Sequence, residues 1–196
     1  MLYKRLSDLY KENEILSEEF PLDEYFPLLQ NFISREVDLG AEYLSPYRFS
    51  LFFSKPTKEI LRFFLGLTDS ENIVEQHYKY ECDECRRINI IKDEESLIHF
   101  KCKNCGSEDS LVTSDYLSEV KLLFKLNEEL LEDFRENLKY NPLPKVSESS
   151  STVLEGGGDI EFTLESVEEV IYKNDKPISK KSEERAERLD LLRRIL

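Results

Sequence analysis

The chain has 196 residues, with 27 basic and 41 acidic side chains and a formal charge of −14. This acidic excess excludes a protein that binds the nucleic-acid backbone mainly through bulk charge, and a content of 40% hydrophobic residues excludes a wholly disordered chain. No apolar run approaches the ~20 residues needed to cross a bilayer, and no apolar stretch of a secretory signal follows the first residues, so we expect a cytoplasmic protein.

Residues 1–77 are predicted to form an N-terminal helical region. In residues 2–20 apolar side chains recur with heptad spacing, and the one polar member of the series is Asn13. This pattern predicts one continuous helix over residues 2–20.

Further elements are expected in the rest of this region. Apolar spacing after Pro21 predicts a second helix. Apolar and polar side chains alternate over residues 47–54, which is typical of a strand. Pro56 and Gly66 bracket a third helix with apolar residues at helical spacing.

Four cysteines form two pairs, Cys82 with Cys85 and Cys102 with Cys105, in the pattern C-x2-C-x16-C-x2-C. This spacing lies within the range expected for a metal site with four thiolate ligands. A two-residue gap lets one tight turn direct both sulfurs at the same ion, roughly 2.3 Å from each. The pattern therefore predicts one metal site made by all four cysteines.

The segment between the two pairs must return the second turn to the first. Residues 88–91 and 96–101 read as two short strands joined by a turn at residues 92–95, a β-hairpin that would deliver Cys102 beside the first pair. Gly106 then supplies a residue free to adopt positive φ next to the second pair.

This arrangement resembles the zinc-ribbon modules of transcription and translation proteins, over about residues 78–112 only. The resemblance implies a zinc-stabilised β-hairpin inserted in the helical body. The sequence departs from it at Arg86, where such turns often carry glycine.

Three other uses of the cysteines compete with a zinc site. A reducing compartment disfavours disulfides, and a thioredoxin-like redox site would need one CxxC at a βα junction. A rubredoxin-like iron centre uses the same ligands, so sequence alone does not separate iron from zinc.

His77 and His99 could replace a cysteine but are not needed, and we expect them to be surface or packing residues. Because four thiolates close the coordination shell, we expect one structural zinc ion.

Basic residues flank the cysteines, namely Arg86, Arg87, Lys101 and Lys103. They can offset the negative charge of a thiolate site, or form a small patch that faces nucleic acid. Compensation of charge needs no partner and is the preferred interpretation.

After the ribbon, residues 113–140 are predicted to form a long amphipathic helix that packs on the N-terminal region. It begins near Ser114, and Asn127 is a polar residue in its heptad series. We hypothesise that the helices carrying Asn13 and Asn127 pack together, or that one of them self-associates. The alternative is that each amphipathic helix of a bundle tolerates one polar residue.

The C-terminal part begins with a linker. Residues 141–158 are rich in Pro, Ser and Gly, which predicts a flexible segment. Residues 159–196 are predicted to form a docking tail, with a strand at residues 159–164 and a short helix capped by Ser166 with Glu169 as its capping-box partner.

The end of this tail has the opposite charge to the rest of the chain. Residues 173–196 carry eight basic and five acidic side chains, and Leu189, Leu192 and Ile195 follow helical spacing. A basic amphipathic segment on a tether usually docks, and the candidates are the acidic body of the same chain, a protein partner or an anionic surface.

The sequence thus predicts an α+β, mainly helical fold with an inserted zinc ribbon, and no recognisable catalytic constellation. The preferred function is a non-catalytic adaptor or accessory subunit of an intracellular multi-subunit complex, with a protein partner or a second copy bound through the heptad series or the tail. The Lys-, Glu- and Ile-rich composition is typical of a prokaryotic or viral source. The alternatives are a nucleic-acid-associated regulator that uses the basic flanks and the tail, and an enzyme without a known motif.

Overall fold

The computed structural model describes residues 1–141 and 162–195. The helices are α1 (Leu2–Glu12), α2 (Glu14–Glu19), α3 (Leu22–Asp38), α4 (Pro46–Phe53), α5 (Thr57–Leu67), α6 (Glu94–Ile98), the 3-10 turn η1 (Ser114–Tyr116), α7 (Glu128–Tyr140), α8 (Leu164–Ile171) and α9 (Lys180–Ile195). The strands are β1 (Tyr43–Leu44), β2 (Val74–Glu81), β3 (Ile88–Ile91), β4 (Phe100–Lys101), β5 (Glu108–Asp109), β6 (Lys121–Leu126), β7 (Tyr172–Lys173) and β8 (Lys176–Pro177).

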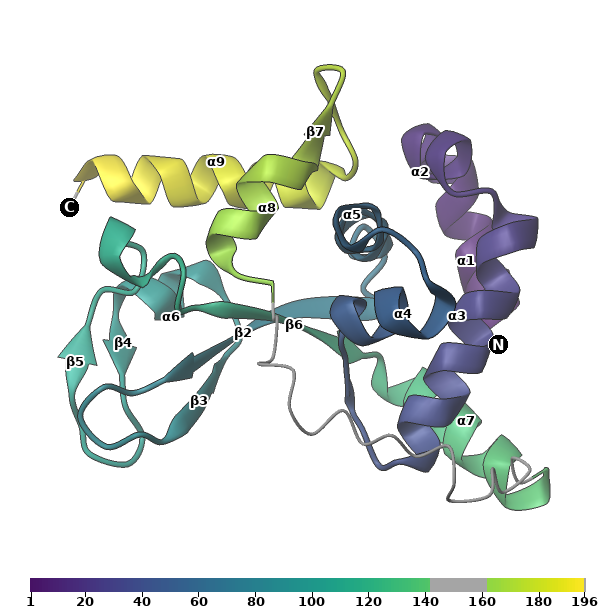
Figure 1. The fold of residues 1–196 in the computed structure, drawn as a ribbon, viewed down its shortest axis with the longest axis horizontal. Helices are drawn as coiled ribbons and strands as arrows, with labels where there is room; N and C mark the ends of the chain where they lie inside the picture. The colour runs from purple at the N-terminus through teal and green to yellow at the C-terminus, as the bar shows by residue number, and fades with distance from the viewer. Residues whose placement is uncertain (142–161, 196) are drawn as a thin grey trace.

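A four-stranded antiparallel sheet with the strand order β1-β6-β2-β3 runs through the molecule. Helices α5, α8 and α9 lie over one face of it, α1, α2, α3 and α7 gather at one end, and β4 and β5 lie at the other end (Figure 1). The fold is α+β and mainly helical, as predicted. The predicted domain boundary between residues 77 and 78 falls inside β2, so the sheet joins the N-terminal region to the cysteine segment.

The core lies between this sheet and the helices. Alternate residues of β6 are buried, and Phe124 contacts Phe64 of α5 with ring centroids 5.3 Å apart. Every residue of α5 from Ile60 to Leu67 is buried. A Cβ atom on Gly66 would lie 2.6 Å from Leu16 Cδ1, so glycine at this position allows α2 to approach α5.

The predicted helix over residues 2–20 is interrupted. It divides into α1 and α2 because Asn13 has extended backbone angles and its side chain accepts a hydrogen bond from the Leu16 amide at 2.8 Å. Asparagine at this position is an N-cap, which starts a new helix rather than continuing the old one. The helices predicted after Pro21 and after Pro56 are confirmed as α3 and α5.

The strand predicted over residues 47–54 is wrong, since this segment forms α4. Ser45 caps α4 by accepting a hydrogen bond from the Arg48 amide, and Pro46 occupies the first turn, where its missing N–H is no loss. Phe49 is buried and Phe53 packs beside it one turn later, with ring centroids 4.8 Å apart. The apparent alternation was therefore a helical stripe of aromatic residues.

The long helix predicted over residues 113–140 is also wrong. The segment contains η1, then the central strand β6, and only then α7. Leu122, Phe124 and Leu126 alternate toward the core, and β6 pairs with β2 over six residues. Asn127 ends the strand and caps α7 by accepting from the Glu129 and Leu130 amides.

Both asparagines of the predicted heptad series are thus helix N-caps. Neither asparagine is a register position in a heptad series, because both side chains cap helices. The helices α1 and α7 nevertheless meet, since Arg5 of α1 donates to Asn127 Oδ1 at 2.8 Å. Self-association of either helix stays a prediction. Asn13 also donates to Asp69 and to the carbonyl of Ile178, both at 2.8 Å, and so connects α2, α5 and the C-terminal part.

Replacement of Asn13 by alanine is expected to lower the free energy of unfolding by about 2 kcal/mol, because it removes a cap and leaves the buried Ile178 carbonyl without its donor. Urea denaturation at neutral pH measures this. Asn137→Ala, an exposed change in the last turn of α7, is the matched control. Equal stabilities of the two variants would contradict the role of Asn13.

The C-terminal part docks on the body of the same chain. Residues 162–164 pair with the start of β6 along its outer side. The Leu122 amide donates to the Phe162 carbonyl at 2.7 Å, and the Leu164 amide donates to the Val120 carbonyl at 3.0 Å.

The predicted helix is present as α8, but its cap is Thr163, with Ser166 as the reciprocal partner, so the predicted Ser166 cap is wrong. The predicted linker at residues 141–158 lies outside the described residues from residue 142 onward, as does the start of the predicted strand.

A buried arginine holds α8 and the β7-β8 turn in place. Arg62 of α5 is only 4% exposed, and its guanidinium binds both oxygens of Glu19 at 2.8 Å. The same group donates to the carbonyl of Val170 at 2.8 Å and to that of Ile171. One buried guanidinium therefore supplies hydrogen-bond donors to the last carbonyl groups of α8 and to the carboxylate at the end of α2.

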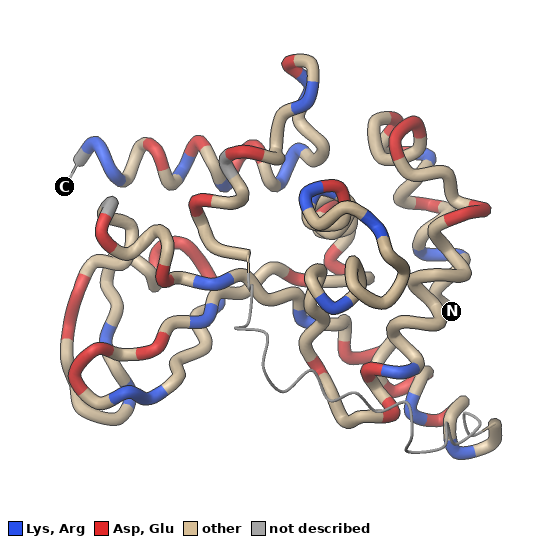
Figure 2. Tube along the Cα trace, viewed as in Figure 1, with Lys and Arg blue, Asp and Glu red and all other residues tan. Residues whose placement is uncertain are grey.

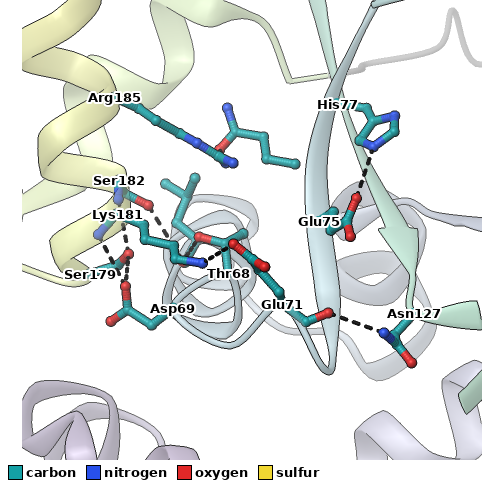
Figure 3. Close-up of polar contacts among 12 residues, drawn as sticks. Thr68, Asp69, Glu71, Glu75, His77, Asn127, Ser179, Lys181, Ser182 and Arg185 are labelled. Carbon is teal, nitrogen blue, oxygen red and sulfur yellow. Dashed lines mark hydrogen bonds and ion pairs between the residues drawn. The ribbon is translucent and has the colours of Figure 1, made fainter. Parts of the chain in front are cut away.

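A second set of polar contacts holds α9 (Figure 3). Asp69 accepts from the Ser179 hydroxyl at 2.6 Å and from the Lys181 amide at 3.1 Å, at the start of α9. Lys181 Nζ lies 2.7 Å from Glu71, and Arg185 donates to Gln76 at 3.2 Å.

Charge complementarity accompanies this docking. Basic positions recur along α9 above acidic residues of the body (Figure 2). Arg185 Nε lies 3.5 Å from the buried Glu94, and Arg188 lies 3.7 Å from Glu95. On the apolar side Leu189 is buried and Leu192 is half-buried, while Ile195 is the last residue of the helix. Of the three docking sites considered for the tail, the structure shows the chain's own body.

The Arg62–Glu19 contact predicts an acid-dependent loss of stability. Burial opposes ionisation of Glu19, but the hydrogen bonds and charges of Arg62 and Lys173 together outweigh burial and lower its pKa. A lowered folded-state pKa contributes stability above the unfolded value of about 4.3 and loses it as pH falls through the folded value. Wild type should exceed Glu19→Gln in urea midpoint at neutral pH, and the two midpoints should converge as the pH falls through the folded-state pKa of Glu19. Glu18→Gln, an exposed neighbour, should match wild type throughout; a Glu19→Gln difference that persists in acid would contradict the linkage.

Candidate metal centre

Two turns with the same backbone hydrogen bonds present the cysteines. In the first, the Cys82 amide donates to the Arg87 carbonyl at 3.0 Å and the Arg86 amide donates to the Cys82 carbonyl at 2.7 Å. In the second, the Cys102 amide donates to the Ser107 carbonyl at 2.8 Å. The return bond from the Gly106 amide to the Cys102 carbonyl is 3.0 Å long.

Each turn requires a left-handed residue after its second cysteine. Gly106 has a φ of 75° and Arg86 has a φ of 56°. Glycine adopts this conformation without a Cβ penalty, whereas arginine is strained there. The arginine at position 86 therefore raises the conformational free energy of the first turn, but the first turn keeps the same shape as the second.

The four sulfur atoms lie within 4.8 Å of one another. The Sγ atoms of Cys82 and Cys105 are 3.7 Å apart, and those of Cys85 and Cys102 are 3.6 Å apart. A tetrahedral ion with metal–sulfur bonds of about 2.3 Å needs sulfur–sulfur edges of about 3.8 Å. The predicted ligands are therefore brought together at the spacing of one four-coordinate ion.

The thiols of this cluster resist simultaneous ionisation in the absence of a cation. The backbone amides of Cys105 and Asn104 lower the pKa of Cys102 to about 6. The amide of Ser107 lowers the pKa of Cys105, but desolvation and the three neighbouring cysteines raise it to about 12. A divalent ion removes this repulsion, so its binding must displace protons from the cluster.

The donor set fits zinc. Four soft sulfur ligands in a tetrahedron bind zinc or iron, and the same chemistry disfavours magnesium and calcium, which bind oxygen. Neither His77 nor His99 belongs to the sulfur cluster: His77 is buried on β2, where its ring lies 3.5 Å from Glu75, and His99 is exposed. With four protein ligands no position remains for a reactive water, so a bound ion would be structural.

Asn89 joins the two turns and was not foreseen from the sequence. Its buried side-chain amide donates to the Arg87 carbonyl at 2.9 Å and lies 3.7 Å from Cys102 Sγ, while its oxygen accepts from the Lys103 amide at 3.3 Å. The available clue was one polar residue within a short apolar strand. Such second-shell groups orient the ligands of a metal.

The predicted hairpin between residues 88–91 and 96–101 is wrong in its pairing. β3 pairs with β2, whereas β4 pairs with β5. Asp93 accepts a hydrogen bond from the Ser96 amide and caps α6, so a helical turn replaces the first part of the second predicted strand, and only β4 at its end is extended. Local capping by aspartate therefore prevails over the strand propensity of this short segment.

The four flanking basic residues are all exposed. Arg86 lies 3.8 Å from Glu81 and Lys101 lies 2.6 Å from Glu108, so two of the four already have acidic partners.

No protein-family model matches the chain, and no curated protein or solved structure matches it either. Within residues 1–141 and 162–195 no helix combines the length and apolar character needed to span a bilayer.

Replacement of Asn89 by alanine should weaken zinc binding by roughly ten- to a hundred-fold, because the two cysteine turns lose their common hydrogen-bond partner. Competition with a chromogenic chelator measures the affinity. Asn104→Ala is the matched control, since the exposed Asn104 acts on Cys102 through its backbone amide. If both variants bind zinc equally, Asn89 does not support the metal site.

Proposed function

We propose that the chain is a non-catalytic, zinc-binding adaptor or accessory subunit of an intracellular multi-subunit complex. The observation that carries this proposal is the closed set of four cysteine ligands. A site of this kind stiffens a fold and leaves no open position for catalysis. Cysteines that bind a metal instead of forming disulfides are typical of a reducing compartment. The Lys-, Glu- and Ile-rich composition supports a prokaryotic or viral source.

The position of the metal site supports a role in contacts with other proteins. The cysteine turns lie at the end of the sheet opposite the N-terminal helices (Figure 1). A rigid projection of this kind can present loops and a strand edge to a partner without burying them in the core. On α4, Leu51 and Phe52 are also exposed, and Arg35 stacks 4.0 Å from the ring of Phe52. Aromatic residues and arginine are enriched at protein interfaces.

Native mass spectrometry of the full chain, isolated from its own cell extract, tests both parts of the proposal. We expect one zinc ion per chain and an assembly heavier than the 23.2 kDa monomer. A Cys105→Ser variant should lose the zinc. A chain that carries no zinc, or that is monomeric in every extract, would contradict the proposal. Bound iron would instead show thiolate-to-iron absorption bands and would correct the metal alone.

A nucleic-acid-associated regulator is the second candidate function. The exposure of Arg86, Arg87, Lys101 and Lys103 around the cysteine turns favours it. The ion pairs of Arg86 and Lys101 and the overall charge of −14 weigh against it.

A further inference from the structure

Strand β3 is an edge of the main sheet. It pairs with β2 on one side, and among the described residues no strand pairs with its other side. Edge strands offer unpaired backbone groups to another chain, and proteins usually cover or blunt them.

The hydrogen-bond pattern identifies which groups point outward. The Cys82 amide donates to the Arg87 carbonyl in the same register that pairs β2 with β3. Hydrogen-bonded pairs alternate along an antiparallel ladder, so Asn89 and Ile91 direct their N–H and C=O groups toward β2. The backbone groups of Ile88 and Ile90 consequently face away from the sheet.

A groove of about 420 Å³ lies beside this edge, between β3 and the α6–β4 segment. Its lining includes Ile90, Lys92, Glu95, His99, Lys101 and Lys103.

The groove is basic in a chain that is acidic overall. Among the described residues Lys92 and Lys103 form no ion pair, whereas Lys101 pairs with Glu108. Glu95, the acidic residue of the lining, lies 3.7 Å from Arg188 of α9, which offsets its charge. An anionic ligand is therefore favoured here, most of all at Lys92, because Lys103 also lies beside the sulfurs of the second cysteine turn.

From these observations we propose that the groove binds an extended acidic segment of a partner protein, which adds as a strand to the outer edge of β3. Its backbone would pair with Ile88 and Ile90, and its carboxylates would contact Lys92 and Lys103. The proposal rests on the proposed adaptor function and names the surface and the partner chemistry of that function.

A peptide fits this groove better than a single-stranded nucleic acid. A peptide strand uses the free backbone groups of an edge, which a nucleic acid does not need. Proteins that bind single strands stack successive bases on several exposed rings, whereas Phe100 of this lining is 4% exposed and leaves His99 as its one exposed ring.

The metal site holds the two walls of the groove together. Asn89 on β3 accepts from the amide of Lys103, which follows Cys102 on the opposite wall. Peptide binding should therefore require the zinc-loaded chain, because loss of the ion releases the wall that carries Lys103.

The probe is an octapeptide of alternating valine and glutamate, added to the zinc-loaded full chain and followed by the amide resonances in NMR. We expect saturable shifts at Ile88, Ile90 and Lys92, and a Lys92→Glu/Lys103→Glu double variant should bind about ten-fold more weakly or worse. Lys4→Glu/Lys139→Glu, the same charge change on exposed residues of α1 and α7, is the control and should bind like wild type.

A backbone variant tests strand addition separately from charge. Ile90→Pro removes an N–H that faces away from β2, so the sheet should tolerate it while peptide binding falls about ten-fold or more. Ile90→Thr keeps the N–H and should retain binding.

Three results would overturn the proposal. These are the absence of shifts at Ile88 and Ile90, equal binding by the Lys92→Glu/Lys103→Glu variant, and tighter binding of an oligothymidylate of the same length to the same amides. If the peptide fails to bind while the chain is still found in a zinc-containing assembly, this inference falls and the adaptor function stands. If the peptide binds but the native chain is always monomeric, the adaptor function falls and the peptide-binding groove stands.

Discussion

The crowding of four cysteine sulfurs, which repel one another when ionised, is the constraint on which the cysteine end of the molecule depends. The sulfurs are 3.6–3.7 Å apart in the two closest pairs, and the pKa of Cys105 is raised to about 12 when no cation is present. A divalent ion bound by the four sulfurs would turn this repulsion into a bond between the two turns. Because β2 ends at the first turn, and Asn89 of β3 binds both turns, a bound ion would also fix the edge of the main sheet.

Buried and half-buried polar contacts play the corresponding role at the C-terminal part. Arg62 satisfies Glu19 and two carbonyls at the end of α8, and Asp69 binds the start of α9. Such contacts are directional, so they place α8 and α9 in one position, whereas apolar burial alone is tolerant of sliding. The acidic body and the basic tail are thus two halves of one docked unit.

The errors of sequence interpretation share one cause. Residues 121–126 are alternately half-buried and buried, as in a strand. The apolar residues of this segment also fit a seven-residue spacing that continues through Asn127, and that longer helical pattern was preferred to a strand. At Asn13 and Asn127 the same residue type can be a buried polar position or a helix cap, and spacing does not separate these uses. The backbone angles around each asparagine do separate them.

The sequence by itself determined which four cysteines come together in one cluster, because C-x2-C spacing encodes a local turn whose geometry needs few distant contacts. It also determined the α+β class, the acidic balance and the basic tail. Only the tertiary structure decided that β3 pairs with β2 rather than with the α6–β4 segment, that Asn89 supports both cysteine turns, and that α9 lies on the same chain. These depend on contacts between residues far apart in the chain, where the free energy of packing and of satisfied polar groups outweighs local propensity.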